Sequence, residues 1–211
     1  DNGLRPYVSD PAALLRTDYL SPHGWMVGNT TGLELLAKWP DRAWEEWLME
    51  PRVRRGRQCV YPEVSRTYTN ASSTGSGSVH SYMGSWHNGT TGYGGNQSEH
   101  HPPMVLNHHM HHWQHEDISY LQAATYQEQL RSRLATARNV SAEELHAIDW
   151  RQETSGVKIQ YSDLGHFTEI VRHFFPGVSH EAKAGVLPAS YQGVVALRYH
   201  HTVHLYLVPR A

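Results

Sequence analysis

Tryptophan and leucine recur at helical spacing between two prolines in the first third of the chain. Trp44, Trp47 and Leu48 lie three and four residues apart, so a helix places all three side chains on one apolar face. Asp41 is a good N-cap for this helix, and Pro51 cannot continue it. We therefore predict an amphipathic helix between Asp41 and Pro51, with its tryptophan face buried.

The segment before this helix predicts a turn and a short helix. Residues 21–25 read Ser-Pro-His-Gly-Trp, in which proline and glycine fix a bend that can approach a ligand closely. Trp25 could stack on a sugar, although taken alone such a large aromatic residue is better explained as part of a core. Apolar spacing over 33–37 then marks a short helix that Pro40 stops.

Residues 117–211 alternate between helical and strand periodicity, which predicts a separate small α+β unit. No catalytic constellation is visible in it. The predicted elements, in chain order, are a long helix over 118–134, a short helix with a capping box at 141–144, a strand over 157–161, a helix over 164–174 ended by Pro176, and an antiparallel hairpin of 193–199 and 203–208.

Residues 69–116 separate this unit from residues 1–68 and are predicted to form a mobile loop or linker. The first part is rich in Gly, Ser and Asn, and the second holds seven histidines between His100 and His115. His108, His111, His112 and His115 would share one face of a helix, a spacing that can bind Zn²⁺ or Cu²⁺. No neighbouring Cys or HExxH arrangement supports a metal site, so we favour a low-complexity tract with adventitious metal affinity.

Composition excludes few classes of protein. The 211 residues carry a net charge of −2, which gives no argument for nucleic acid or an anionic membrane surface as the main partner. No run of eighteen apolar residues predicts a membrane span, and no signal peptide is visible at the N-terminus. Five Asn-x-Ser/Thr sequons suit a luminal protein, and they lie at Asn29, Asn70, Asn88, Asn96 and Asn139.

Two adjacent carboxylates lie on the tryptophan helix. Glu45 sits about 100° round from Trp44, at the margin of the apolar face, whereas Glu46 points further toward solvent. A carboxylate half desolvated against indole can work as a general base near neutral pH. The alternative is that both glutamates only solvate an amphipathic helix.

Arginines and the single cysteine follow this helix. Arg52, Arg54, Arg55 and Arg57 form a basic patch that suits a diphosphate, or that complements the helix dipole in solvent. Cys59 has no other cysteine in the chain to pair with. In an oxidising compartment its partner would lie elsewhere, and the alternative is a small buried thiol.

Order and spacing of several motifs indicate a family. The main ones are LLRTDYLSPHGW (14–25), KWP (38–40), WEEW (44–47), P-x-x-R-x-G-R-x-C (51–59) and PEVSRTY (62–68), with weaker matches in DISYLQAATY (117–126), VKIQY (157–161) and GVVALRYHHTVHLYLVP (193–209). These motifs resemble glycosyltransferase family 13, the enzymes similar to N-acetylglucosaminyltransferase I. The resemblance covers almost the whole chain and only the C-terminal half of such an enzyme.

The resemblance implies roles for individual residues. Glu45 stands where the WDDW motif of the family has its first Asp, the catalytic base, although Glu is longer by one methylene. Trp44, Trp25, Gly24 and His23 would line the pocket for the transferred sugar. Arg54 and Arg57 are candidates for phosphate contact, and Cys59 would form a disulfide with the missing half.

The resemblance also implies the reaction. It is the inverting transfer of GlcNAc from UDP-GlcNAc to a mannose of an N-glycan. Residues 1–68 would be the C-terminal part of a GT-A type α/β catalytic domain, and residues 117–211 would be a small α+β C-terminal domain. Mn²⁺ would be bound by an acidic triplet that is not in this chain, so this chain alone would be inactive. We expect a Golgi enzyme anchored through a missing N-terminal segment. The alternatives are transfer to O-linked mannose and a catalytically dead glycan-binding remnant. An intact acidic triplet upstream would distinguish an enzyme from such a remnant.

Overall fold

A computed structural model of the chain describes residues 10, 12–20, 25–63, 111–175, 180–199 and 203–210. Within these residues the architecture is mixed α/β, which confirms the predicted fold class at that level. None of the helices in these ranges is long and apolar enough to cross a bilayer. The predictions outside the described residues are those for His23, Gly24, most of the 69–116 segment, and the sequons at Asn70, Asn88 and Asn96.

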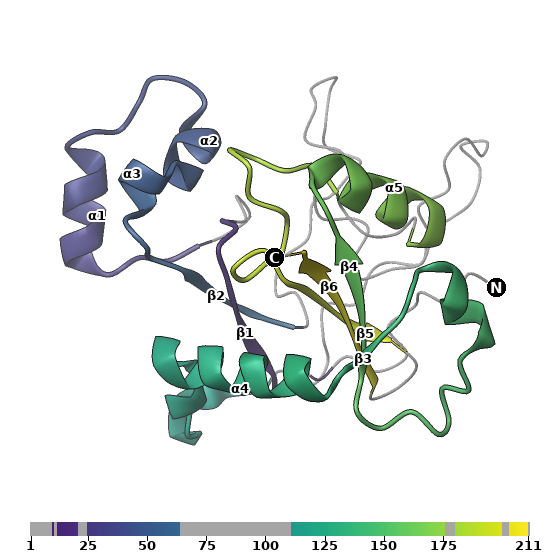
Figure 1. Cartoon of the computed structure of the whole chain (residues 1–211). Coiled ribbons are helices and arrows are strands. Elements are labelled where there is room, and N and C mark those ends of the chain that lie inside the picture. Colours follow the sequence, from purple (N-terminus) through teal and green to yellow (C-terminus); the bar gives the residue numbers. More distant parts are fainter. Residues whose placement is uncertain are drawn as a thin grey trace, which may run out of the picture.

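Two strands that are distant in sequence pair at the base of the N-terminal helices. β1 (Leu14–Thr17) and β2 (Cys59–Pro62) run antiparallel, with Thr17 opposite Cys59. The chain between them folds into three helices that lie together beyond one end of this strand pair (Figure 1). These helices are α1 (Asn29–Leu36), α2 (Trp44–Met49) and α3 (Pro51–Arg54).

The helix that carries Glu45 begins at Trp44, later than predicted. Ala43 has φ 51° and ψ 38°, which is the left-handed conformation, so the helix does not extend back to Asp41 and the prediction of Asp41 as its N-cap is wrong. At the other end Glu50 is extended, as expected of a residue before proline, and Pro51 takes the first position of α3. The prediction that Pro51 ends the helix is confirmed.

α2 buries its last turn more completely than its tryptophans. Leu48 and Met49 are 8% and 1% exposed, whereas Trp44 and Trp47 are only half-buried. The prediction of a buried tryptophan face is therefore wrong in its extent. Both indole rings pack against Trp39, which is itself 37% exposed.

A four-stranded sheet lies at the centre of the C-terminal part. Its order is β3-β4-β6-β5; β4 runs parallel to β3 and β6, and β5 runs antiparallel to β6. The predicted strand and the predicted hairpin are both confirmed. The strands are β3 (Arg138–Asn139), β4 (Val157–Tyr161), β5 (Val195–Tyr199) and β6 (Val203–Pro209).

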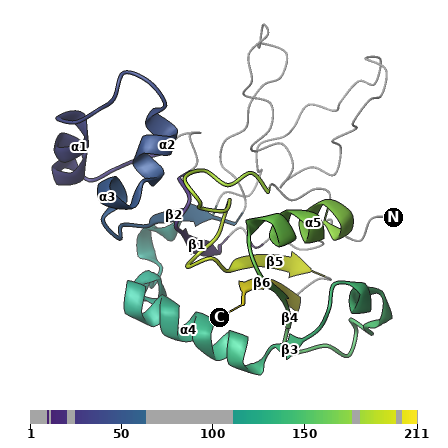
Figure 2. The ribbon, with the colours of Figure 1, turned by 45° about the horizontal axis from the view of Figure 1, so that its top comes forward.

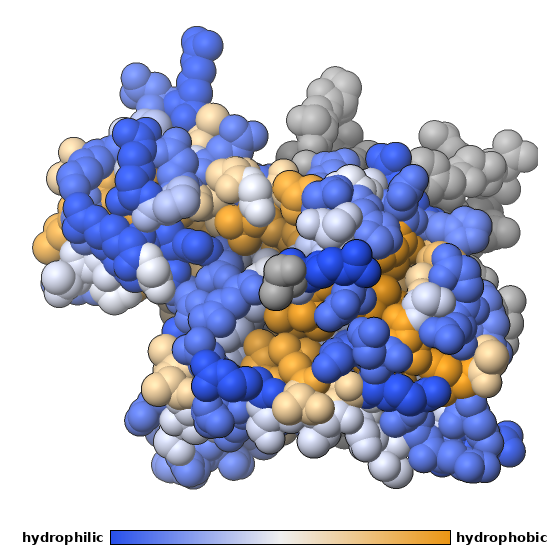
Figure 3. All heavy atoms as spheres, in the orientation of Figure 1, coloured by the Kyte–Doolittle hydropathy of each residue, from blue (hydrophilic) through white to orange (hydrophobic). Residues whose placement is uncertain are grey.

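Helices cover both faces of this sheet, because alternate residues of each strand point to opposite sides. α5 (Leu164–Phe174) places Phe167 and Val171, both fully buried, against Leu205 of β6. α4 (Ala123–Thr136) brings Leu130 and Leu134 to the opposite face, near Tyr206. Figure 2 shows α5 and α4 on opposite sides of the strands, and Figure 3 shows apolar side chains gathered over the sheet between them.

Two of the predicted C-terminal helices differ from their predicted form. The predicted helix over 118–134 is divided, because Gln122 is extended between the 3₁₀ turn η3 (Ser119–Leu121) and α4. The Ser141 N–H donates to Glu144 Oε2 at 2.6 Å, which is one half of the predicted capping box, and the short helix is the 3₁₀ helix η4 (Glu143–Ala147).

β1 lies between the N-terminal helices and the C-terminal sheet, and it bonds to both parts of the chain. Arg16 Nη1 donates to the Leu121 carbonyl oxygen at 2.5 Å. Thr17, which is 4% exposed, donates through Oγ1 to the Ser190 carbonyl oxygen at 2.9 Å. The first bond fixes β1 to the turn before α4, and the second fixes it to the segment that follows α5.

Candidate functional site

Four tryptophans from α2 and the segments before it form an aromatic cluster. The rings of Trp25 and Trp39 are nearly parallel, with centroids 6.2 Å apart and planes 12° apart, and Trp44 lies 5.7 Å from Trp39. Trp47 meets the edge of Trp39 at 5.7 Å. Trp25 and Trp39 are 36% and 37% exposed, so the cluster offers indole faces to solvent and is not a sealed core.

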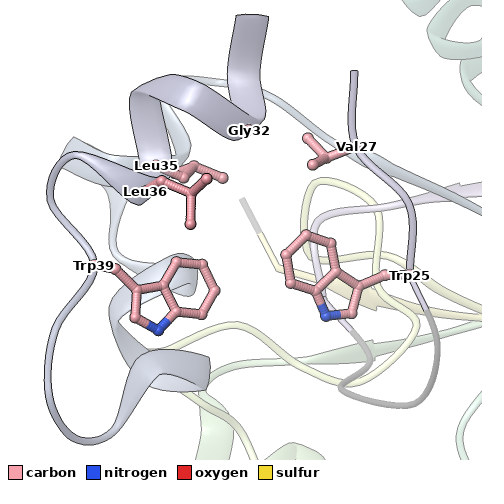
Figure 4. A pocket seen from close by; sticks show the side chains of 6 residues that line it. All are labelled: Trp25, Val27, Gly32, Leu35, Leu36 and Trp39. Carbon is pink, nitrogen blue, oxygen red and sulfur yellow. The ribbon is translucent and has the colours of Figure 1, made fainter. Parts of the chain in front are cut away.

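A cavity of about 280 Å³ opens beside this cluster. In Figure 4 the indole rings of Trp25 and Trp39 lie on opposite sides of the cavity, below helix α1. Leu35 and Leu36 of α1 contribute the wall nearest the helix. The lining is apolar and aromatic, which suits the apolar face of a small organic ligand.

Glu45 stands at the edge of the aromatic cluster, on α2. Its side chain is 32% exposed, while Glu46 is exposed, as their spacing predicted. The Lys183 ammonium donates to Glu45 Oε2 and forms an ion pair with it. The environment of this carboxylate is thus set by a cation from the C-terminal part as well as by indole.

Asp18, directly after β1, ties three segments together. Its Oδ1 accepts from Gln58 Nε2 at 2.9 Å and lies 3.2 Å from Arg54 Nη1. Its Oδ2 accepts the Gln192 N–H at 2.5 Å, and its own N–H donates to the Ser190 carbonyl oxygen at 2.7 Å. Since the Asp18 side chain is only 12% exposed, these bonds are well shielded from water.

The arginine patch is paired with acidic residues of this chain. Arg57 lies 2.7 Å from Glu34, and Arg55 lies 3.1 Å from the same carboxylate. The bond from Arg57 is the main reason that the pKa of Glu34 is held below its usual value. Arg54 bonds to Asp18. Phosphate contact by Arg54 and Arg57 therefore stays a prediction, and it would require an arginine to serve a second partner.

Cys59 is half-buried at the start of β2 and makes no disulfide among the described residues. Burial raises the pKa of its thiol, so little thiolate is present near neutral pH. The predicted disulfide with a cysteine outside this chain remains a prediction.

We expect Cys59 of the natural full-length protein to resist alkylation in denaturant until a reductant is added. A disulfide blocks the sulfur even when the chain is unfolded, whereas a buried thiol becomes reactive on unfolding. Mass mapping of the non-reduced protein checks this. Alkylation of Cys59 in denaturant without reductant would support the buried-thiol alternative instead.

The described histidines of the tract do not share a helix face. His112 is extended, and η2 (Trp113–His115) is a single 3₁₀ turn. His111 lies 3.5 Å from Glu116. Among the residues that the structure describes, no three His, Cys, Asp or Glu side chains converge in a way that could hold a metal ion.

Sequence reasoning missed two residues that organise this site. Lys183 lies 138 positions from Glu45, in a segment where no motif was noted, and Asp18 was given no role. The sequence offered little signal for Lys183 beyond the rarity of lysine, which occurs in this chain only as Lys38, Lys158 and Lys183. The structure brings the rings of Trp25 and Trp44 to within 6.3 Å of each other, and Glu45 follows Trp44 on α2.

Comparison with known proteins gives two findings. The family model described as "GNT-I family" matches residues 1–211. Over 208 residues the chain is 32% identical to the Arabidopsis thaliana protein "Alpha-1,3-mannosyl-glycoprotein 2-beta-N-acetylglucosaminyltransferase". This match covers 99% of the chain and 43% of the plant protein, so the chain spans less than half the length of that relative.

Proposed function

The chain belongs to the GNT-I family, and on this premise we propose that the natural full-length protein transfers GlcNAc from UDP-GlcNAc to a mannose of a glycoprotein N-glycan. The proposed product has a β-1,2 linkage, formed with inversion at the sugar's anomeric carbon. The name of the plant relative supports this kind of reaction. The observation that carries the proposal is the position of Glu45, a half-exposed carboxylate at the edge of an aromatic cluster, in a chain that matches the family throughout.

In the proposed reaction Glu45 acts as the general base. Its carboxylate takes the proton of the acceptor hydroxyl while the hydroxyl oxygen forms a bond to C1 of GlcNAc. The bond between C1 and the diphosphate oxygen breaks, and its electron pair leaves with UDP. The accepted proton then returns to solvent from Glu45, which is 32% exposed.

The tryptophans supply a surface for a sugar ring. The face of a pyranose presents C–H groups that pack on indole, and Trp25 and Trp44 both lie within the cluster beside Glu45. Both residues therefore remain candidates for the sugar subsite, together with Trp39, whose ring stacks on each of them. His23 and Gly24 stay candidates on the resemblance alone.

Mn²⁺ does not fit the residues described here. The family implies a metal at the diphosphate, yet no convergent set of ligands is found within the described ranges. We therefore assign no step of the reaction to a metal through this chain. The proposal keeps Mn²⁺ as a cofactor of the full-length protein, with ligands outside these residues.

Compartment and fold type belong to the same proposal. We infer a GT-A type catalytic domain in the Golgi lumen, held by an anchor outside this chain, with no nucleic-acid partner. One observation supports a luminal site: the sequon residues Asn29 and Asn139 are both exposed. The net charge of −2 gives no argument for a nucleic-acid partner.

A transfer assay with two acceptors tests the proposal. The full-length protein, supplied with UDP-GlcNAc and Mn²⁺, is expected to add GlcNAc to a mannose-terminated N-glycan faster than to an O-mannosyl peptide, with one UDP released for each sugar transferred. Faster transfer to the O-mannosyl peptide would show that the preferred acceptor is O-linked mannose and not an N-glycan. No transfer to either, with glycan binding retained, would favour a non-catalytic glycan-binding protein.

A further inference from the structure

Lys183 meets the proposed catalytic base from the opposite part of the chain. The lysine belongs to the segment between α5 and β5, whereas Glu45 belongs to α2, and their side chains form an ion pair. We propose that Lys183 is a positioning residue, which holds the Glu45 carboxylate in the orientation needed to accept the acceptor's proton. This inference rests on the proposed function.

The two side chains differ in exposure in the way this role requires. Lys183 is 11% exposed, so its ammonium is largely removed from water and held by protein groups. Glu45 is 32% exposed and can still meet a substrate. The ammonium bonds Oε2, and among the described residues no protein group bonds Oε1. One carboxylate oxygen is therefore held in place while the other is left for the acceptor hydroxyl.

The backbone beneath Lys183 is itself fixed. Lys183 and Val186 exchange two hydrogen bonds, N–H to carbonyl, of 3.0 and 2.8 Å. Leu187, directly after this bridge, is 2% exposed, and the Ser190 carbonyl oxygen accepts bonds from Thr17 and Asp18. A long lysine side chain can position a neighbour only if its own backbone does not move, and this anchoring meets that condition.

Two arginines that follow α2 bond carboxylates other than Glu45. Arg52 bonds Glu50, and Arg54 bonds Asp18. Glu46 is exposed on the same helix. Within the described ranges, Lys183 is thus the cation that bonds Glu45. Without it the carboxylate would be free to rotate about its three side-chain torsions.

Replacement of Lys183 by Met in the full-length protein tests this role. We expect kcat to fall by about tenfold to a hundredfold, since misplacing a reacting group by about 1 Å can cost about a hundredfold. KM for UDP-GlcNAc should stay within about twofold, because Lys183 is assigned no contact with the donor. Lys183→Arg, which keeps a cation that can bond a carboxylate, should recover much of the loss.

Lys158 provides a matched control. It is a half-buried lysine on β4 whose Nζ donates to the Leu134 carbonyl oxygen at 2.7 Å, away from Glu45. Lys158→Met removes a comparable hydrogen bond from the same part of the protein and should leave kcat unchanged. If it lowers kcat as much as Lys183→Met does, general loss of structure explains both effects and the positioning role is wrong. If Lys183→Met does not fold, Lys183→Gln, which keeps a neutral donor, is measured in its place.

The Glu45→Gln background separates this inference from the proposed function. Lys183 is expected to act through the base, so Lys183→Met should add little loss once Glu45 is Gln. An equal loss in both backgrounds would overturn the positioning role. Wild-type kcat in Lys183→Met, with Glu45→Gln inactive, would overturn this inference alone, whereas wild-type kcat in Glu45→Gln would overturn the proposed base as well.

Discussion

Replacing Asp18 by Ala is expected to destabilise the protein by about 2–4 kcal/mol, between the typical costs of a lost buried hydrogen bond and of a broken buried ion pair. Asp18 accepts bonds from Gln58 and from the Gln192 N–H, and it pairs with Arg54. Alanine leaves all three donors without this acceptor in a site from which water is largely excluded. Urea unfolding of the variant and of the wild type, followed by intrinsic tryptophan fluorescence, measures the difference.

Glu128→Ala is the control for this prediction. Glu128 also pairs with an arginine, Arg131, at 2.6 Å, but both side chains are well exposed, at 69% and 67%. A solvent-exposed pair contributes roughly 0–1 kcal/mol, so this variant should unfold close to the wild type. Equal stability of the two variants would mean that Asp18 does not hold the segment around Gln192 against β1.

Elements built on local periodicity could be predicted from the sequence. β4 shows the expected alternation, with Val157, Ile159 and Tyr161 buried, and α5 places Phe167, Ile170 and Val171 inward. These patterns succeed because one face of each element contacts the core, and that contact repeats with the period of the element.

The region around α2 could be predicted only in part. Tryptophan spacing identified the helix, but it could not show that Trp44 stacks on Trp39 and that Trp47 meets the edge of the same ring, because Trp39 lies before the helix. Asp41 has the right side chain for an N-cap, yet the left-handed conformation of Ala43 starts the helix later. Composition alone does not reveal such a backbone conformation in a non-glycine residue.

The partners of the site could not be predicted, because they are distant in sequence. Lys183 meets Glu45 across 138 positions, and Gln192 meets Asp18 across 174. Charge and spacing say nothing about contacts of this range without the fold. The arginine patch shows the same limit: an isolated run of positive charge suggested a phosphate site, whereas Arg55 and Arg57 both reach Glu34 on α1.

Replacing Glu45 by Gln is expected to lower kcat by roughly 10²–10⁴-fold, the usual share of general acid–base catalysis. Glutamine keeps the size of the side chain and an oxygen that can accept from Lys183, but it cannot take a proton from the acceptor hydroxyl. Donor affinity should hardly change, because the proposal places the uridine and metal contacts outside α2.

Two further variants serve as controls for Glu45. Glu46→Gln changes an exposed carboxylate one position along the same helix and should be close to neutral. Glu45→Asp keeps the carboxylate, and Asp is the residue that the resemblance implies at this position, so partial or full activity is expected. If Glu46→Gln is inactive while Glu45→Gln is active, the assignment of the base to Glu45 is wrong.

The most direct test of the account is the steady-state rate of GlcNAc transfer from UDP-GlcNAc to a mannose-terminated N-glycan, measured for the full-length wild type and its Glu45→Gln variant at saturating donor. We predict transfer by the wild type and a loss of roughly 10²–10⁴-fold in the variant, with unchanged binding of UDP-GlcNAc. Equal rates for the two proteins would contradict the account, because the base would then not lie on α2.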